Sequence, residues 1–226
     1  MIYSRVDILY NYKISILMKA HTKETQAKLT PNTALDILKE GNKRFTNNSK
    51  ADRNLLEQVK DTQGGQYPFA VILSRIDSRV PAEIVFDQGI GDVFSARVAG
   101  NIVDKDILGS IEYGCKVAGS KLVVVLGHTS CGAVKGACDD VELGNITSLV
   151  SKIKPAVAAV EEPKDASQRT SSNTDFVNEV SKTNVHHTLD NMRKQSPLLT
   201  EMEENNEIKI VGAMYNVSTG EVTFYN

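Results

Sequence analysis

The sequence of 226 residues contains no tryptophan and only three cysteines, and its formal net charge is −2. An odd number of cysteines argues against a disulfide framework and predicts a reducing, cytoplasmic setting. The small net charge gives no electrostatic reason to expect nucleic acid or an anionic membrane as a partner. No apolar run approaches the roughly 18 residues that a membrane-spanning helix needs, so no membrane segment is expected.

The composition that remains is that of an ordinary soluble protein, with 41% hydrophobic and 24% charged residues. The length favours a single core. Residues 8–18 are half apolar but interrupted by polar residues, which is not typical of a secretory signal, and Met18 could serve as an alternative start. We therefore expect residues 1–28 to form a poorly ordered N-terminal extension and residues 29–226 to form one α/β domain.

Short apolar runs separated by helical patterns predict the fold class. The early runs are suited to buried parallel strands, and the last two alternating segments flank a turn and predict a hairpin. We predict an α/β fold with a mostly parallel central sheet of about five strands, an antiparallel C-terminal edge strand and flanking helices. The expected strands are residues 69–74, 93–98, 122–126, 208–215 and 221–225, and the expected helices are residues 31–46, 55–59, 82–86, 107–117, 133–138, 146–160 and 173–194.

The segment from residue 121 to residue 135 combines a buried strand, a glycine-containing turn and the start of a helix. His128 and Cys131 lie in that turn, where open α/β proteins place their functional groups. Imidazole and thiolate are both good zinc ligands, so the pair predicts part of a tetrahedral zinc site. A buried core histidine and a small core cysteine are the alternative interpretation of the same pair.

A second candidate, Asp77 and Arg79, follows the strand expected at residues 69–74. A carboxylate held by a guanidinium keeps a low pKa and a fixed orientation, so it can accept a hydrogen bond from a metal-bound water. A solvated ion pair in a turn, which contributes little, is the alternative.

These residues and the segments around them resemble the β-class carbonic anhydrases. The motifs occur in the order found in that family and are densest between residues 68 and 139. The matching segments are PFAV (68–71), DSRVPAE (77–83), FDQG (86–89), RVAGN (97–101) and GHTSCGAV (127–134).

The resemblance implies a homodimer or homotetramer of α/β subunits, a zinc cofactor, and reversible hydration of CO2 to bicarbonate. In that family, two cysteines and one histidine hold the zinc beside an aspartate–arginine dyad. His128 and Cys131 match the histidine and the second cysteine, and Asp77 and Arg79 match the dyad with its catalytic role. The position of the first cysteine, two residues before the dyad aspartate, is occupied by Arg75.

Arg75 changes what the resemblance predicts, because a guanidinium has no lone pair to donate to a metal. At about 4 Å and an effective dielectric constant of about 20, its repulsion with Zn²⁺ would be roughly 8 kcal/mol. Structural zinc sites bind with apparent energies of roughly 10 to 16 kcal/mol. We therefore expect weakened zinc affinity and weakened CO2 hydration.

Several outcomes remain open at this stage. In the first, Arg75 occupies the place of the zinc and leaves a metal-free protein. In the second, Arg75 swings outward and zinc binds through Asp77, His128 and Cys131. In the third, the arginine is a change peculiar to this sequence, since cysteine and arginine codons can differ by one base. The alternative function is a catalytically inactive protein that binds a small anion or acts as a scaffold. Its expected anion-binding residues are Arg97, Gly100 and Asn101.

The remaining candidates for metal ligands are less well placed. Cys115 and Cys138 could replace the missing ligand, but their helical contexts favour core packing. His186 and His187 lie on a polar helix and are expected at the surface. Because the chain has no tryptophan, an accessory bicarbonate site of the kind built around tryptophan in some family members would have to be made differently.

Overall fold

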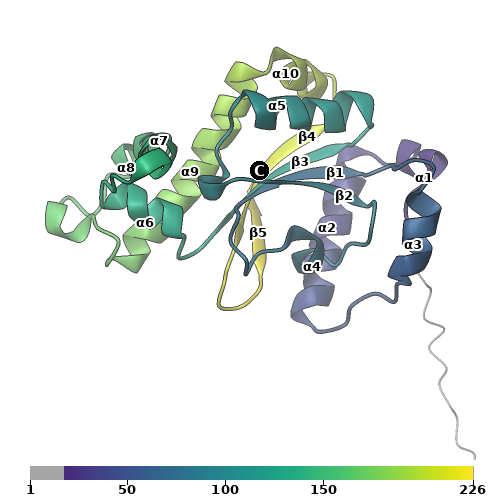
Figure 1. The fold of residues 1–226 in the computed structure, drawn as a ribbon, viewed down its shortest axis with the longest axis horizontal. Coiled ribbons are helices and arrows are strands. Elements are labelled where there is room, and N and C mark those ends of the chain that lie inside the picture. Colours follow the sequence, from purple (N-terminus) through teal and green to yellow (C-terminus); the bar gives the residue numbers. More distant parts are fainter. Residues whose placement is uncertain (1–17, 226) are drawn as a thin grey trace, which may run out of the picture.

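The computed structural model describes residues 18–225, which form an α/β fold around one five-stranded sheet (Figure 1). The strand order is β2-β1-β3-β4-β5, and β5 is antiparallel to β4 whereas the other neighbours are parallel. The fold class expected from the sequence is confirmed. The strands are β1 (Ala70–Ser74), β2 (Val93–Arg97), β3 (Leu122–His128), β4 (Lys209–Tyr215) and β5 (Val222–Tyr225).

The central strands β1 and β3 are buried along their whole length. Their unbroken apolar sequences follow from this position, because helices cover both faces of a parallel sheet. The register pairs Ser74 of β1 with Arg97 of β2, and Leu73 of β1 with Val125 of β3. The carboxyl ends of these strands therefore meet at one edge of the sheet.

Helices cover both faces of the sheet (Figure 1). One face packs against α2 and α4, and the other against α5, α9 and α10. A third apolar cluster joins α6, α7 and α8 to the first half of α9. The helices are α1 (Lys23–Ala27), α2 (Pro31–Thr46), α3 (Leu55–Thr62), α4 (Ala82–Val85), α5 (Lys105–Glu112), α6 (Gly132–Cys138), α7 (Gly144–Ser151), α8 (Lys154–Ala159), α9 (Thr174–Gln195) and α10 (Pro197–Glu204), with short helical turns η1 (Ala99–Asn101), η2 (Tyr113–Val117) and η3 (Ala166–Gln168).

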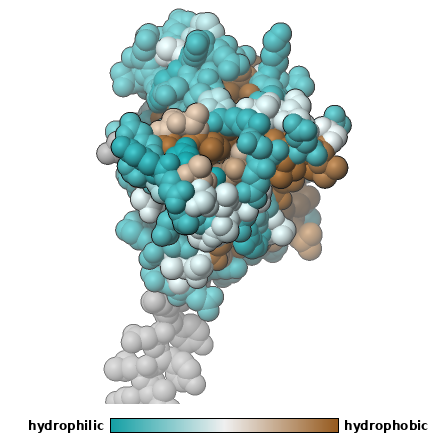
Figure 2. All heavy atoms as spheres, turned by 90° about the vertical axis from the view of Figure 1, so that its left-hand side faces the viewer, coloured by the Kyte–Doolittle hydropathy of each residue, from teal (hydrophilic) through white to brown (hydrophobic). Residues whose placement is uncertain are grey.

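Figure 2 views the molecule from the end formed by α6, α7 and α8. This surface is mostly hydrophilic and is interrupted by smaller apolar areas. Within residues 18–225, none of the helices combines the length and the apolar character needed to cross a membrane.

The second helix shows how the sequence determines local structure. The Thr30 side chain accepts a hydrogen bond from the Thr33 backbone N–H at 3.2 Å, and Pro31 occupies the first turn, as both residue types do at helix starts. Gly41 allows α2 to approach α4, because a Cβ at this position would lie 1.9 Å from the Phe86 carbonyl oxygen.

The N-terminal boundary differs from the expectation. Residues 18–28 were assigned to a poorly ordered extension, but they include α1 and the buried side chain of Gln26. Gln26 Nε2 donates to the carbonyl oxygens of Pro68 and Ala118 at 2.7 and 2.8 Å, which fixes α1 to the body of the protein. The expected boundary at residue 28 is therefore corrected for residues 18–28, whereas residues 1–17 lie outside the described part.

The elements elsewhere differ from the expectation in detail. The helical region expected at residues 146–160, with Pro155 as a kink or boundary, forms two helices, α7 and α8, and Pro155 lies in the first turn of α8, where its missing backbone N–H is tolerated. The helix α10 was not expected, because its short apolar pattern follows α9 after a break of one residue. Strand β3 continues through His128, beyond the apolar run that predicted it.

Candidate functional site

The candidate site is built at the carboxyl ends of β1, β2 and β3. Arg75 and Asp77 follow β1, η1 follows β2, and His128 is the last residue of β3. Cys131 comes next along the chain, at the residue before α6. The fold therefore brings together the residues that the sequence analysis selected from separate segments, because parallel strands end at the same edge.

Asp77 and Arg79 form a bidentate ion pair. Arg79 Nε lies 2.9 Å from Oδ1 of Asp77, and one terminal nitrogen lies 2.7 Å from Oδ2. The Arg79 backbone N–H also donates to Oδ1 at 2.9 Å. The hydrogen bonds from the Arg79 side chain hold the pKa of Asp77 well below its usual range, in spite of partial burial, so this carboxyl is ionised at neutral pH.

Arg75 lies fully inside the protein, with 1% of its surface exposed. Its Nε donates to Oδ1 of Asn101 at 2.6 Å, and one terminal nitrogen donates to the His128 carbonyl oxygen at 3.3 Å. The other terminal nitrogen is buried and has no hydrogen-bond partner. Burial lowers the pKa of Arg75, and the nearby Cys131 and Asp77 oppose that shift.

Cys131 is 3% exposed and lies beside this guanidinium. Burial alone would raise its pKa, but the positive charge of Arg75 and the neighbouring His128 lower the pKa to about 7. A substantial fraction of the side chain is therefore thiolate at neutral pH, with Arg75 as its counterion.

His128 presents an unpaired nitrogen to the same space. Its Nδ1 lies 2.8 Å from the Thr129 carbonyl oxygen, which assigns the proton to Nδ1 because a carbonyl can only accept. Its Nε2 is buried without a hydrogen-bond partner and lies 3.5 Å from Oδ2 of Asp77. A zinc-ligating histidine uses the same tautomer.

The residues expected to bind an anion have structural partners in this arrangement. Arg97 is exposed, and it donates to the backbone carbonyl oxygens of Arg75 at 3.1 Å and Asp77 at 2.7 Å. The Gly100 carbonyl accepts from Asn184 Nδ2 at 2.8 Å. Asn101 uses Oδ1 to hold Arg75, whereas its Nδ2 is buried and unpaired.

Two residues of α9 support the site and were missed from the sequence. Asn184 holds η1 through Gly100, and Oδ1 of Asn178 accepts from the Ser130 backbone N–H at 2.9 Å. Ser130 has a φ of 55°, so this hydrogen bond stabilises a strained turn between His128 and Cys131. No motif marks either asparagine, because each acts across a long separation in the sequence.

The side chains present do not fit a zinc ion in this arrangement. The buried, positively charged guanidinium of Arg75 lies beside Cys131 and donates to the His128 carbonyl oxygen, so a cation already lies next to two candidate ligand residues. Within residues 18–225, no three His, Cys, Asp or Glu side chains are placed to hold one metal ion. Cys115 and Cys138 do not complete the set, because neither belongs to such a group among the described residues.

Comparisons with known proteins agree on one family. The sequence profile described as "Carbonic anhydrase" matches residues 70–222. The chain is 36% identical over 196 residues to Carbonic anhydrase 2 of Mycobacterium tuberculosis, covering 84% of this chain and 90% of that protein. It is 33% identical over 198 residues to the carbonic anhydrase of Mycolicibacterium smegmatis, covering 85% and 92%.

Solved structures of β-carbonic anhydrases share the fold. The β-carbonic anhydrase CafA of Aspergillus fumigatus aligns with a TM-score of 0.66 at 23% identity, covering 86% of this chain and 90% of that chain. A structure of the tetrameric β-carbonic anhydrases of Sordaria macrospora aligns with a TM-score of 0.65 at 20% identity, covering 86% and 95%.

Proposed function

Because this chain belongs to the β-carbonic anhydrase family, we propose that it retains a site for bicarbonate in which Arg75 stands where the first zinc-ligand cysteine would be. Zinc affinity and zinc-dependent hydration of CO2 are strongly weakened, and the working state is a metal-free protein that binds a small anion. The observation that carries this proposal is the complete burial of the Arg75 guanidinium among Asn101, His128 and Cys131.

The charges around the site favour an anion. Arg75, Arg79 and Arg97 lie at the ends of adjacent strands, and the negative groups close to them are Asp77 and the partly ionised Cys131. The cations therefore outnumber the anions. An excess of positive charge attracts small anions, and guanidinium groups pair well with planar oxyanions.

Bicarbonate also matches the hydrogen-bonding groups present. It carries one hydroxyl donor and oxygen acceptors, so Asp77 can accept from the hydroxyl while a guanidinium donates to the other oxygens. Arg79 keeps Asp77 ionised and in one orientation. In this proposal the dyad positions the anion.

Zinc binding through Asp77, His128 and Cys131 is the second candidate, and it would keep the enzymatic function of the family. It is favoured by the unpaired Nε2 of His128, 3.5 Å from Asp77 Oδ2. It requires Arg75 to leave its buried position and its hydrogen bond to Asn101. We therefore place it second.

Metal analysis and a CO2 hydration assay on the purified full chain test the proposal. We expect substoichiometric zinc and hydration close to the uncatalysed rate for the wild type. Arg75→Cys should bind about one zinc per chain and gain activity, because it restores a thiolate ligand and removes the cation. Arg75→Ser is the matched control, since it removes the cation without supplying a thiolate. Stoichiometric zinc with rapid turnover in the wild type would refute the proposal.

Bicarbonate binding is measured separately by calorimetry on metal-free protein. We expect saturable binding to the wild type and a loss of about tenfold in Arg79→Gln, the size expected when one charge-assisted hydrogen bond is removed. Absence of binding to the metal-free wild type would exclude the anion-binding function and leave a scaffold role.

We further propose a homodimer or homotetramer in the cytoplasm. The edge strand β2 pairs only with β1 among the described strands, and an apolar groove lined by Phe94, Ile107 and Tyr113 lies beside it. The free state of all three cysteines supports a reducing compartment. Light scattering coupled to size-exclusion chromatography tests the assembly, and a monomeric mass at micromolar concentration would contradict it.

A further inference from the structure

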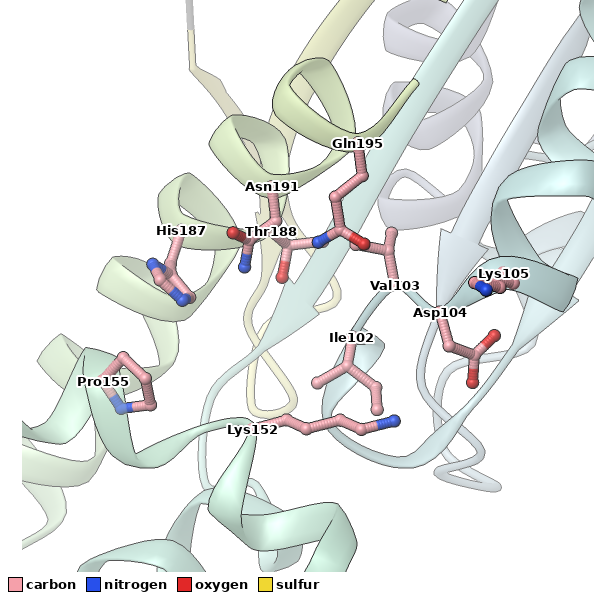
Figure 3. A pocket seen from close by; sticks show the side chains of 10 residues that line it. All are labelled: Ile102, Val103, Asp104, Lys105, Lys152, Pro155, His187, Thr188, Asn191 and Gln195. Atoms are coloured by element: carbon pink, nitrogen blue, oxygen red, sulfur yellow. The ribbon is translucent and has the colours of Figure 1, made fainter. Parts of the chain in front are cut away.

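A groove lies beside the residues that follow the turn η1. It measures about 440 Å³ and is bounded by residues 102–105, the α7–α8 junction and one face of α9 (Figure 3). Ligand pockets for small molecules usually measure about 300 to 1,000 Å³, so the groove has room for a metabolite. Its lining residues are Ile102, Val103, Asp104, Lys105, Lys152, Pro155, His187, Thr188, Asn191 and Gln195.

One wall of the groove is a polar face of α9. His187, Asn191 and Gln195 recur every four residues, which places them on the same side of the helix, and Thr188 lies beside them. Figure 3 shows Thr188, Asn191 and Gln195 directed from α9 toward the segment that contains Ile102 and Val103. This wall offers one hydroxyl and two amides.

None of these polar side chains is used to hold the fold. In the part of the chain that the structure describes, the side chains of His187, Thr188, Asn191 and Gln195 form no hydrogen bond to protein. Thr188 is only 2% exposed as a whole residue, and its side chain makes no hydrogen bond to the described part of the protein, so its hydroxyl is free to bind a ligand in the groove. His187 and Asn191 are half-buried and Gln195 is exposed, so their polar groups are also free to hydrogen-bond a ligand in the groove.

The opposite side of the groove carries two lysines. Lys105 begins α5 and Lys152 directly follows the last residue of α7, and neither forms an ion pair within residues 18–225. Figure 3 shows the Lys152 side chain extended across the groove toward Asp104. Asp104 is the only acidic residue of the lining, and its Oδ1 accepts from the Ile107 backbone N–H at 3.0 Å as the cap of α5. The groove therefore carries a net positive charge.

We propose that this groove binds a small organic phosphate. Lys105 and Lys152 supply the positive charge for the phosphate group, and Asn191, Gln195 and Thr188 supply hydrogen bonds to its oxygens and to the carbon skeleton. Ile102, Val103 and Pro155 provide an apolar surface for the organic part. The site is separate from the bicarbonate site, because its lining contains none of the residues assigned there, although Ile102 directly follows Asn101.

Calorimetric titration of the full chain with phenyl phosphate and with inorganic phosphate tests the proposal. We expect saturable binding at one site per chain, with phenyl phosphate tighter because it also covers the apolar surface. The double variant Lys105→Gln/Lys152→Gln should weaken binding by at least about tenfold, since it removes both charged donors. Asn191→Ala should weaken it severalfold without changing the net charge of the protein.

The matched control is Lys28→Gln/Lys60→Gln, which removes the same charge from exposed lysines on the far side of the molecule. It should bind both ligands as the wild type does. Equal weakening of binding in the control variant, or unchanged affinity in Asn191→Ala, would show general charge attraction and overturn the proposal. Absence of binding to the wild type would also overturn it. Bicarbonate binding should be the same in all these variants, so failure here is distinguishable from failure of the proposed function.

Discussion

The protein buries arginine side chains in two places with different partners. Arg53 has 7% of its side chain exposed and lies 2.7 Å from Oδ1 of Asp87, whose other oxygen is held by Arg44. Arg75 is 1% exposed, but no Asp or Glu oxygen lies within ion-pair distance of it in residues 18–225. Its partners are the Asn101 side chain and the His128 carbonyl oxygen.

Unpaired nitrogen atoms do not distinguish the two places, because Nε of Arg53 and a terminal nitrogen of Arg75 both lack hydrogen-bond partners. The two places differ in the carboxylate of Asp87, which lies beside Arg53 and has no counterpart within ion-pair distance of Arg75 in residues 18–225. Asp87 balances the charge of Arg53, whereas Arg75 has only the partly ionised Cys131 beside it, so part of its desolvation cost is not repaid. Sequences tolerate such a cost at functional sites. The comparison therefore favours a stabilising role for the Asp87 cluster and is consistent with the proposed functional role of Arg75.

The largest expected effect on stability is at Asp87. Asp87→Asn should lower the free energy of unfolding by about 3 kcal/mol, because it leaves the buried Arg53 and the partly buried Arg44 without a counterion. Asparagine tolerates the positive φ of 47° at this position, so backbone strain does not contribute. Urea unfolding measures the change.

The control for Asp87 is an exposed ion pair of similar length. Asp140 lies 2.7 Å from Lys154, and both side chains are exposed. Asp140→Asn should therefore cost less than about 1 kcal/mol. Similar losses in the two variants would contradict the structural role given to the Asp87 cluster.

The second prediction concerns pH. Arg75 and His128 lower the pKa of the buried Cys131 from 9.0 to about 7 against the effect of burial. A lowered pKa in the folded state stabilises the protein above the unfolded value, and this stability is lost as pH falls through the folded value. The free energy of unfolding should therefore rise by up to about 2 kcal/mol from about pH 7 to pH 9. Cys131→Ser should remove this rise, and an equal rise in the variant would refute the assignment.

The third prediction is that replacing Arg75 raises the free energy of unfolding, whereas replacing Asp87 lowers it. At about pH 6, where Cys131 is mostly a thiol, Arg75→Met should raise the free energy of unfolding by about 1 kcal/mol. The substitution removes a buried charge, and this gain exceeds the loss of the hydrogen bond to Asn101. Urea unfolding measures the sign, and a loss comparable to that of Asp87→Asn would show that Arg75 is a structural residue.

Much of the fold and of the site could be predicted, because both follow from local patterns. The apolar runs of β1 and β3 and the hairpin of β4 and β5 are continuous in sequence, and parallel strands place Asp77, His128 and Cys131 at one edge. The place of Arg75 in that set followed from the resemblance to the β-class carbonic anhydrases, in which the first zinc-ligand cysteine lies two residues before the dyad aspartate. Whether its side chain turns inward depends on packing, and the sequence left this open.

The contacts that support the site could not be predicted. Asn184 and Gly100 are 84 residues apart in the chain, and so are Ser196 and Glu112, which also form a hydrogen bond. Single polar residues on an amphipathic helix give no periodic signal for such partners. For the same reason, His187 was expected only at the surface, whereas the structure places it in a groove with unpaired polar neighbours.

The smallest expected effect on stability is that of a substitution, Asn101→Asp, which gives Arg75 the carboxylate that it lacks. Asn101→Asp keeps the side-chain shape and the 2.6 Å hydrogen bond, and it replaces an amide nitrogen that has no partner. The free energy of unfolding should change by less than about 1 kcal/mol, because the new attraction is offset by the desolvation of a second charge.

The pKa of Cys131 should rise in the same variant, because the new carboxylate competes for Arg75 and repels the thiolate. Thiolate absorbance isolates this residue, since burial keeps Cys115 and Cys138 protonated to about pH 12 and 11. Bicarbonate affinity should fall with the loss of net positive charge, and an unchanged thiol titration would show that Arg75 does not control the charge of this site.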